Sequence, residues 1–226
     1  MSYSLTYTVR KALHAPELQG LWNGAAWSHA AALPIDRFLP VSVGFRPVVQ
    51  AKMLHADRHL HVLFRVDDRF VRTITTDYMG PVYKDACVEL FIQPKPGKGY
   101  FNFEMNSGGA MLISYIEDPT RLPQGFAKYT KVPWDLAKDI AVYHSLPKTV
   151  EPENPSPVTW VVEYALPLAL MEHYVGSVGD LSGQEWRGNL YKCAEHNSQP
   201  HWASWAPLGP EVNFHVPQYF APIRFE

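Results

Sequence analysis

The segment from residue 82 to residue 94, VYKDACVELFIQP, carries acids and aromatic rings at the spacing of a β-strand. Alternate side chains of a strand point to opposite faces of its sheet. One face is apolar and predicts a core: it holds Ala86, Val88, Leu90 and Ile92. The other face holds Asp85, Cys87, Glu89, Phe91 and Gln93. Solvated strand faces usually carry Thr, Lys or Ser, so this second face predicts the floor of a groove that offers carboxylates and rings.

The same alternation on three other predicted strands adds planar polar groups to such a face. These are Arg65 in HLHVLFRVD, Asn102 and Glu104 in YFNFEMNS, and Asn189 and Tyr191 in RGNLYKCAE. Amides, carboxylates and guanidinium groups hydrogen-bond to paired hydroxyls, and rings stack on the apolar faces of sugars. If these strands are neighbours, the pattern indicates a polyhydroxylated ligand. A solvated sheet face, with an ion pair between Arg65 and one glutamate, fits the same pattern.

Two acids could instead process a glycosidic bond. Glycosidases use two carboxyl groups about 5 to 10 Å apart. Asp85 and Glu89 are four residues apart on one strand, about 13 Å, which is too far. Glu89 and Glu104 on adjacent strands could meet the distance, so a glycoside-processing enzyme remains an alternative. The sequence contains no G-x-S-x-G, Walker or G-x-G-x-x-G motif.

Four aspartates predict a candidate calcium site around the segment 68–82. They are Asp67, Asp68, Asp77 and Asp85. Calcium takes six to eight oxygen ligands, which loops commonly supply. The alternative is that Asp67 and Asp68 cap the turn after a strand. No other cofactor is expected, and calcium is expected at most as a structural ion.

Composition excludes several classes of partner. The 226 residues include 20 basic and 22 acidic side chains, a net charge of −2 that argues against nucleic acid and against an anionic membrane surface. The N-terminus lacks the apolar core of a signal peptide, so the sequence as written predicts a cytoplasmic protein, or an extracytoplasmic one if a signal was removed. Two cysteines, Cys87 and Cys193, are too few for a disulfide scaffold. Nothing in the sequence indicates the oligomeric state.

The elements that must position these residues are predominantly strands. Twenty prolines and 13% aromatic residues favour an all-β chain. Strand-like runs occupy 3–9, 48–54, 59–67, 85–93, 99–106, 110–116, 139–145, 158–166, 187–194 and 220–225. Only 166–174 has a helical period, residues 48–116 resemble a meander of hairpins, and 68–82 and 118–134 are predicted as long loops. One domain over 1–226, an antiparallel β-sandwich, is the expected fold.

Three segments carry a resemblance to a known family. They are the strand DACVELFI, the strand YFNFEMNSGG, and the C-terminal SWAPLG…NFHVPQYFAPIRF. Together they resemble carbohydrate-binding module family 9 and its wider DOMON-like sandwich relatives. The resemblance implies an immunoglobulin- or jelly-roll-like sandwich of two packed sheets that binds a saccharide or polysaccharide without catalysis.

The resemblance also implies roles for individual residues. The two tryptophans that sandwich a sugar in family members fall on Tyr83 and Phe214, and the family's hydrogen-bonding glutamate falls on Glu89. Its arginine falls on Glu104 and its glutamine falls near Tyr191, so the ligand itself does not carry over. Family members commonly hold structural calcium. Some DOMON-like relatives bind haem through methionine with histidine or lysine; here Met79 lies in a predicted loop and Met105 faces the predicted core.

Overall fold

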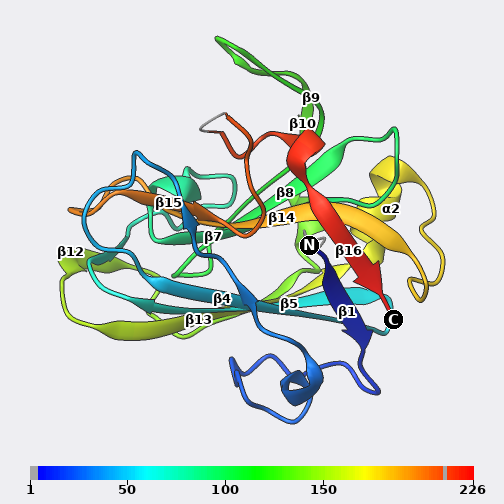
Figure 1. Ribbon diagram of the computed structural model, residues 1–226, viewed down its shortest axis with the longest axis horizontal. Helices are drawn as coiled ribbons and strands as arrows, with labels where there is room; N and C mark the ends of the chain where they lie inside the picture. The colour runs from blue at the N-terminus through cyan, green and yellow to red at the C-terminus, as the bar shows by residue number, and fades with distance from the viewer. Residues whose placement is uncertain (1–4, 211–212) are drawn as a thin grey trace.

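Two β-sheets pack face to face and form the body of the protein (Figure 1). The computed structural model describes residues 5–210 and 213–226. The predicted all-β sandwich is therefore confirmed. The start of the first predicted strand, at residues 3–4, lies outside the described residues.

The first sheet carries the site described below. Its strands, in spatial order, are β10 (Gly125–Lys131), β9 (Met111–Leu122), β8 (Tyr100–Asn106), β7 (Cys87–Gln93), β14 (Glu185–Ala194), β16 (Ala221–Phe225) and β1 (Tyr7–Lys11). Beside β14 lies β15 (His201–Ser204), which pairs with β3 (Arg37–Phe38).

The second sheet covers the inner face of the first. In order it contains β1, β4 (Val48–Ala56), β5 (His59–Asp68), β13 (Val158–Pro167) and β11 (Ala141–His144), with β2 (Leu33–Pro34) on β4. Strand β1 joins the sheets, because its first half runs parallel to β16 and its second half parallel to β4. A separate pair contains β6 (Val71–Thr73) and β12 (Val150–Asn154).

Helices are few and short. They are α1 (Trp134–Ala137), α2 (Leu168–Val175) and the 3-10 turns η1 (Trp27–His29), η2 (Val82–Lys84) and η3 (Pro217–Tyr219). The predicted helical stretch at 166–174 corresponds to α2. Within the described ranges, no helix has the length and apolar character needed to cross a membrane.

The core forms where the alternating apolar faces of the two sheets meet. Val88, Leu90 and Ile92 of β7 are fully buried there, as are Phe64 of β5 and Phe103 of β8. Each face is apolar at every second residue, so burial of one face leaves the intervening side chains on the other. The apolar face predicted for the opening segment is thus the core face.

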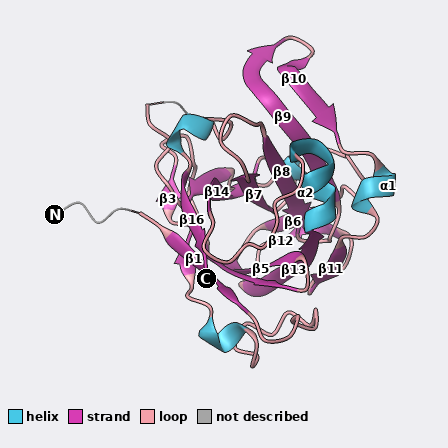
Figure 2. Cartoon of the chain, turned by 90° about the vertical axis from the view of Figure 1, so that its right-hand side faces the viewer, coloured by secondary structure: helices cyan, strands magenta, loops and turns pink. Residues whose placement is uncertain are grey.

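Two predictions about connectivity are wrong. Residues 48–116 do not form one meander, because the chain passes from β5 in the second sheet through β6 to β7 in the first. Residues 118–134 are not a loop, because β9 continues to Leu122 and pairs with β10 in a long hairpin that extends beyond the sheets (Figures 1 and 2). Gly125 follows the turn with φ 130°, a backbone angle that only glycine adopts without strain.

Candidate functional site: an acidic cleft on the outer face of the first sheet

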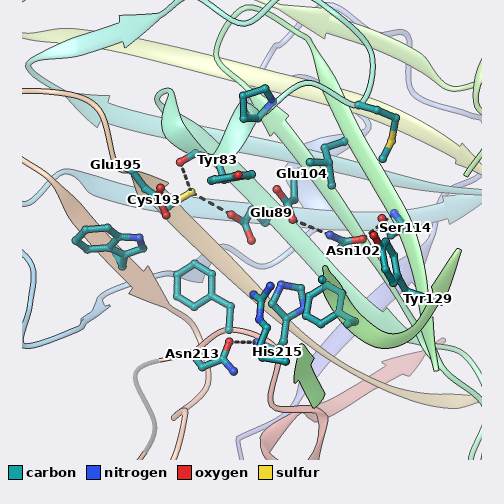
Figure 3. Close-up of a pocket in the computed structure, with 18 of the residues that line it drawn as sticks. Tyr83, Glu89, Asn102, Glu104, Ser114, Tyr129, Cys193, Glu195, Asn213 and His215 are labelled. Atoms are coloured by element: carbon teal, nitrogen blue, oxygen red, sulfur yellow. Dashed lines mark hydrogen bonds between the residues drawn. The ribbon is translucent and has the colours of Figure 1, made fainter. Parts of the chain in front are cut away.

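A cleft of about 680 Å³ lies on the face of the first sheet that turns away from the core (Figure 3). This volume is within the usual range for a small-molecule site. Strands β7, β8 and β14 supply its floor, and the walls come from η2, β15, the β9–β10 hairpin and the segment before η3. The outer sheet face predicted as a groove is therefore the floor of the cleft.

Two glutamates lie side by side on the floor. Glu89 of β7 and Glu104 of β8 are directly opposite in the strand register, which places their Cβ atoms about 4.5 to 5.5 Å apart. They are 3% and 5% exposed. Asn102, two residues before Glu104, donates its amide N–H to Glu104 Oε1 at 2.6 Å. Alternation along β8 puts Asn102 and Glu104 on the same face, and the register with β7 brings them to Glu89.

Burial keeps these acids protonated to higher pH than usual. The pKa of Glu104 is raised to about 7, because burial outweighs the hydrogen bond from Asn102 and the positive charge of Arg121. Burial, Cys193 and the neighbouring Glu104 raise the pKa of Glu89 well above its ordinary value. Glu104 Oε2 is buried without a hydrogen-bond partner among the described residues. The floor therefore holds one carboxyl oxygen that no described residue hydrogen-bonds, and two carboxyl groups whose protonated form burial favours.

Two thiols adjoin the acids. Cys87 and Cys193 are opposite one another on β7 and β14, and both are free. The Cys193 thiol donates to Glu89 Oε1 at 3.0 Å and contacts the Tyr83 carbonyl oxygen at 3.4 Å. Ligand atoms of Cys87, Glu89 and Cys193 lie within 4.8 Å of one another, the one such group among the described residues. Burial raises the pKa of the Cys87 thiol to about 12 and that of Cys193 well above its usual value, so a metal would have to displace two tightly held protons.

Aromatic rings flank the acids on two sides. Tyr83 of η2 lies beside Cys193, and Trp202 and Phe214 pack into the same cluster. Tyr129 and His215 are on the opposite side of the acids in Figure 3. Flat rings around a polar floor suit a ligand that has apolar faces and hydroxylated edges.

The structure brings most of the predicted ligand-binding residues to this cleft. The lining includes Tyr83, Glu89, Asn102, Glu104 and Phe214. One face of the Phe214 ring stacks on Tyr191 with the centroids 4.1 Å apart, which leaves its other face for a ligand. The Tyr191 hydroxyl donates to the Phe214 carbonyl oxygen at 2.9 Å. Tyr191 is fully buried and supports Phe214 from beneath.

Three further residues predicted on this face do not line the cleft. Arg65 is on β5 in the second sheet, where it pairs with Asp67 at 2.8 Å, so it is not a neighbour of Glu89. Asn189 shares the correct face but is buried, accepting hydrogen bonds from the backbone N–H groups of Leu190 and Ala206. Asp85 precedes β7 and accepts hydrogen bonds elsewhere, so it is not part of the floor.

The four aspartates do not fit a calcium site. The Asp68 carboxylate accepts from the Trp160 indole at 3.0 Å and the Arg69 backbone N–H, and Lys192 Nζ is 3.9 Å away. Asp85 accepts from two backbone N–H groups and from the Asn106 amide. These carboxylates are occupied by protein donors and a cation, whereas calcium needs a shell of free oxygens. Asp67 is paired with Arg65. Among the described residues, none of the four aspartates, Asp77 included, belongs to a group of side chains close enough together to hold a metal ion.

The candidate haem ligands serve other contacts. Met105 is fully buried in the core between the sheets. Met79 lines the cleft, and its sulfur accepts a hydrogen bond from the Ile113 backbone N–H at 3.3 Å.

Sequence reasoning missed several lining residues. Trp202 is on β15, a short strand directly opposite Cys193 that was not predicted. Arg121, Phe126 and Tyr129 come from the hairpin that was predicted as a loop. Two signals in the sequence could have predicted these strands. They are the alternation of side chains in HWAS, and the aromatic residues that follow a glycine in GFAKYTK.

Comparisons with known proteins agree with the fold. The model of the family described as carbohydrate-binding family 9 matches residues 26–225. A crystal structure of a proposed carbohydrate-binding protein from Bacteroides uniformis ATCC 8492 is 26% identical, covers 98% of this chain and 99% of that chain, and has a TM-score of 0.84. No curated protein matches this chain.

Two more distant structures share the fold. Both are a carbohydrate-binding module of family 9 from Caldicellulosiruptor kristjanssonii, and each is 13% identical. The complex with cellotriose covers 98% of this chain and 94% of that chain at a TM-score of 0.66, and the complex with glucose covers 97% and 95% at 0.63. Since the family model spans nearly the whole sequence and the two-sheet fold agrees with it, this chain belongs to carbohydrate-binding family 9.

Proposed function

We propose that the acidic cleft binds a saccharide and performs no chemistry on it. The observation that carries the proposal is the buried floor of Glu89, Glu104 and Asn102 between aromatic walls, in a chain of a carbohydrate-binding family. Hydroxyls of the sugar would donate to Glu104 Oε2 and exchange hydrogen bonds with Glu89. The rings of Tyr83 and Trp202 would stack on the sugar's apolar faces. The related modules with cellotriose and with glucose support a saccharide as the ligand class.

The acid pair is a poor fit to glycosidase chemistry. Hydrolysis requires one carboxyl that stays protonated and one that stays ionised, in environments that push their pKa values apart. Here burial raises the pKa of both Glu89 and Glu104, so neither carboxyl group is stabilised in its ionised form. This arrangement favours binding over the alternative of a glycoside-processing enzyme that uses the two glutamates.

Titration calorimetry with a panel of oligosaccharides tests the proposal. We expect binding by the parent and a loss of about 1 to 3 kcal/mol of binding free energy in Tyr83→Ala and in Trp202→Ala, because each removes one stacking ring. Tyr219→Ala removes an exposed ring that does not line the cleft and is the matched control. Chromatography of the same mixtures should show intact oligosaccharides. Unchanged affinity in both cleft variants would show that the saccharide binds elsewhere on the protein. Hydrolysis products would show that the protein is an enzyme.

A further inference from the structure

The cleft floor holds a pair of acids that the fold alone does not explain. Glu89 and Glu104 are cross-strand neighbours, and like charges directly opposite one another destabilise a sheet. A neutral sugar needs only hydrogen-bond acceptors, which two amides would supply without that cost. The pair therefore points to a ligand that compensates negative charge.

No basic side chain meets this need from within the described chain. Neither glutamate forms an ion pair there, and Glu104 Oε2 has no partner. Glu195, half-buried in the wall, adds a third carboxylate. The cationic residues of the lining, Arg121 and Lys131, are exposed at the rim, and Arg121 lies 4.1 Å from the centroid of the Phe126 ring. The floor is acidic and the rim is basic.

We infer that the cleft selects a saccharide carrying a free primary amine, a hexosamine unit, and holds its ammonium group between Glu89 and Glu104. This inference rests on the proposed function, because the amine replaces one hydroxyl of a sugar bound in the same cleft. An ammonium group offers three donors and a full charge, which matches two adjacent carboxylates and the free Oε2 atom. An N-acetylated amine offers one donor and no charge, so the acetylated sugar binds less tightly.

Protons provide a second readout of this arrangement. Burial and the neighbouring acid raise the pKa values of the pair, and an ammonium group placed between them lowers both again. The other titratable or charged groups around the pair include the thiols of Cys87 and Cys193, the phenols of Tyr83, Tyr100 and Tyr191, Glu195 and Arg121. Binding of the protonated amine near pH 6 therefore releases protons from the glutamates, whereas a neutral sugar leaves them in place.

Titration calorimetry of the full chain at pH 6 tests the inference with three ligands of equal length. They are a glucosamine oligosaccharide, its N-acetylated counterpart and a cello-oligosaccharide. We expect the free amine to bind at least tenfold tighter, a difference of about 1.4 kcal/mol. Titrations in buffers of different ionisation enthalpy should show proton release for the amine alone.

Two variants assign the preference to the acid pair. Glu104→Gln should weaken binding of the amine at least tenfold more than it weakens binding of the neutral sugars, and Glu89→Gln should do the same. Glu185→Gln is the matched control, since Glu185 is exposed on β14 and pairs with Arg224 outside the cleft. Thermal melting of each variant verifies that it folds. If Glu104→Gln does not fold, Glu89→Gln alone tests the inference.

The outcomes separate this inference from the proposed function. If the neutral sugars bind as tightly as the amine, or if both glutamine variants keep the preference, the inference is overturned and saccharide binding stands. If no ligand binds, both are overturned.

Discussion

At the scale of single residues, the protonation state of Glu89 decides what a substitution does to binding. A glutamine resembles a neutral carboxyl group, because each has one acceptor oxygen and a donor. Burial raises the pKa of Glu89 well above its ordinary value, so its neutral form is favoured to a higher pH than that of an exposed glutamate. Its contribution to a neutral sugar then depends on hydrogen bonds rather than on charge.

We therefore expect Glu89→Gln to change the affinity for a neutral saccharide by less than about 0.5 kcal/mol, and Glu89→Ala to lower it by about 1 to 3 kcal/mol. Titration calorimetry at pH 7 measures both. A charged Glu89 would behave differently, because loss of a charge-assisted hydrogen bond costs about 1.5 to 3 kcal/mol. A loss of that size in Glu89→Gln would show that the acid is ionised in the cleft.

Glu104 should make the folded protein less stable as the pH rises. Its pKa is about 7 in the folded state, against about 4.3 in an unfolded chain. The folded state therefore holds a proton that the unfolded state has lost between these values. The stabilisation is complete below about pH 4.3 and is lost as the pH rises through 7, with a total on the order of 3 to 4 kcal/mol.

Urea denaturation of the parent and of Glu104→Gln at several pH values measures this effect. The variant cannot titrate at residue 104, so it should become the more stable of the two at pH 8 and above. The difference between the two proteins should shrink towards pH 4. A difference that does not vary with pH would contradict the raised pKa.

At the scale of elements, the part of the β9–β10 hairpin beyond Ile116 builds one wall of the cleft and little of the core, whereas Met111, Ile113 and Tyr115 of β9 are buried in the core. Arg121, Phe126 and Tyr129 all line the cleft, and the segment around the turn is largely exposed. The pairing of β9 with β8 ends at Ile116, so the distal hairpin does not support the rest of the sheet.

Replacing residues 120–127 by a short turn should weaken saccharide binding at least tenfold while the melting temperature changes by only a few degrees. The expected loss in affinity follows from removal of the Phe126 ring and the Arg121 charge from the cleft. Arg69→Ala, at an exposed residue that does not line the cleft, controls for surface changes. Full affinity in the shortened protein would show that the hairpin does not contact the ligand.

Strand positions were predictable because their signal is local. All ten predicted strand runs correspond to strands of the structure, since alternating burial leaves a period of two in the sequence. The partners of each strand were not predictable in the same way. Arg65 and Glu89 have the same local pattern, yet β5 and β7 are in different sheets, because the connection through β6 crosses the sandwich. Glu89 and Glu104 were correctly paired because one short turn joins their strands.

At the scale of the whole molecule, a buried ion pair links the two sheets. Lys192 of β14 is fully buried with its Nζ 3.9 Å from Asp68 Oδ2 of β5. Asp68 also accepts the Trp160 indole N–H of β13 at 3.0 Å, and Lys192 Nζ is 2.9 Å from His201 Nε2 of β15. Burial and Lys192 lower the pKa of His201 to about 3, so the histidine is neutral and accepts from the lysine. The predicted calcium ligand Asp68 thus has a lysine as its counter-charge.

Removal of one partner should destabilise the sandwich more than removal of both. Lys192→Met leaves the Asp68 carboxylate buried without its cation, which typically costs about 3 to 5 kcal/mol. The double variant Asp68→Asn, Lys192→Met removes both charges and retains an acceptor for Trp160, so it should regain much of that loss. Chemical denaturation of the parent, both single variants and the double variant gives the coupling energy directly. Additive effects of the two substitutions would show that the pair does not hold the sheets together, and packing of the apolar faces would then account for their association.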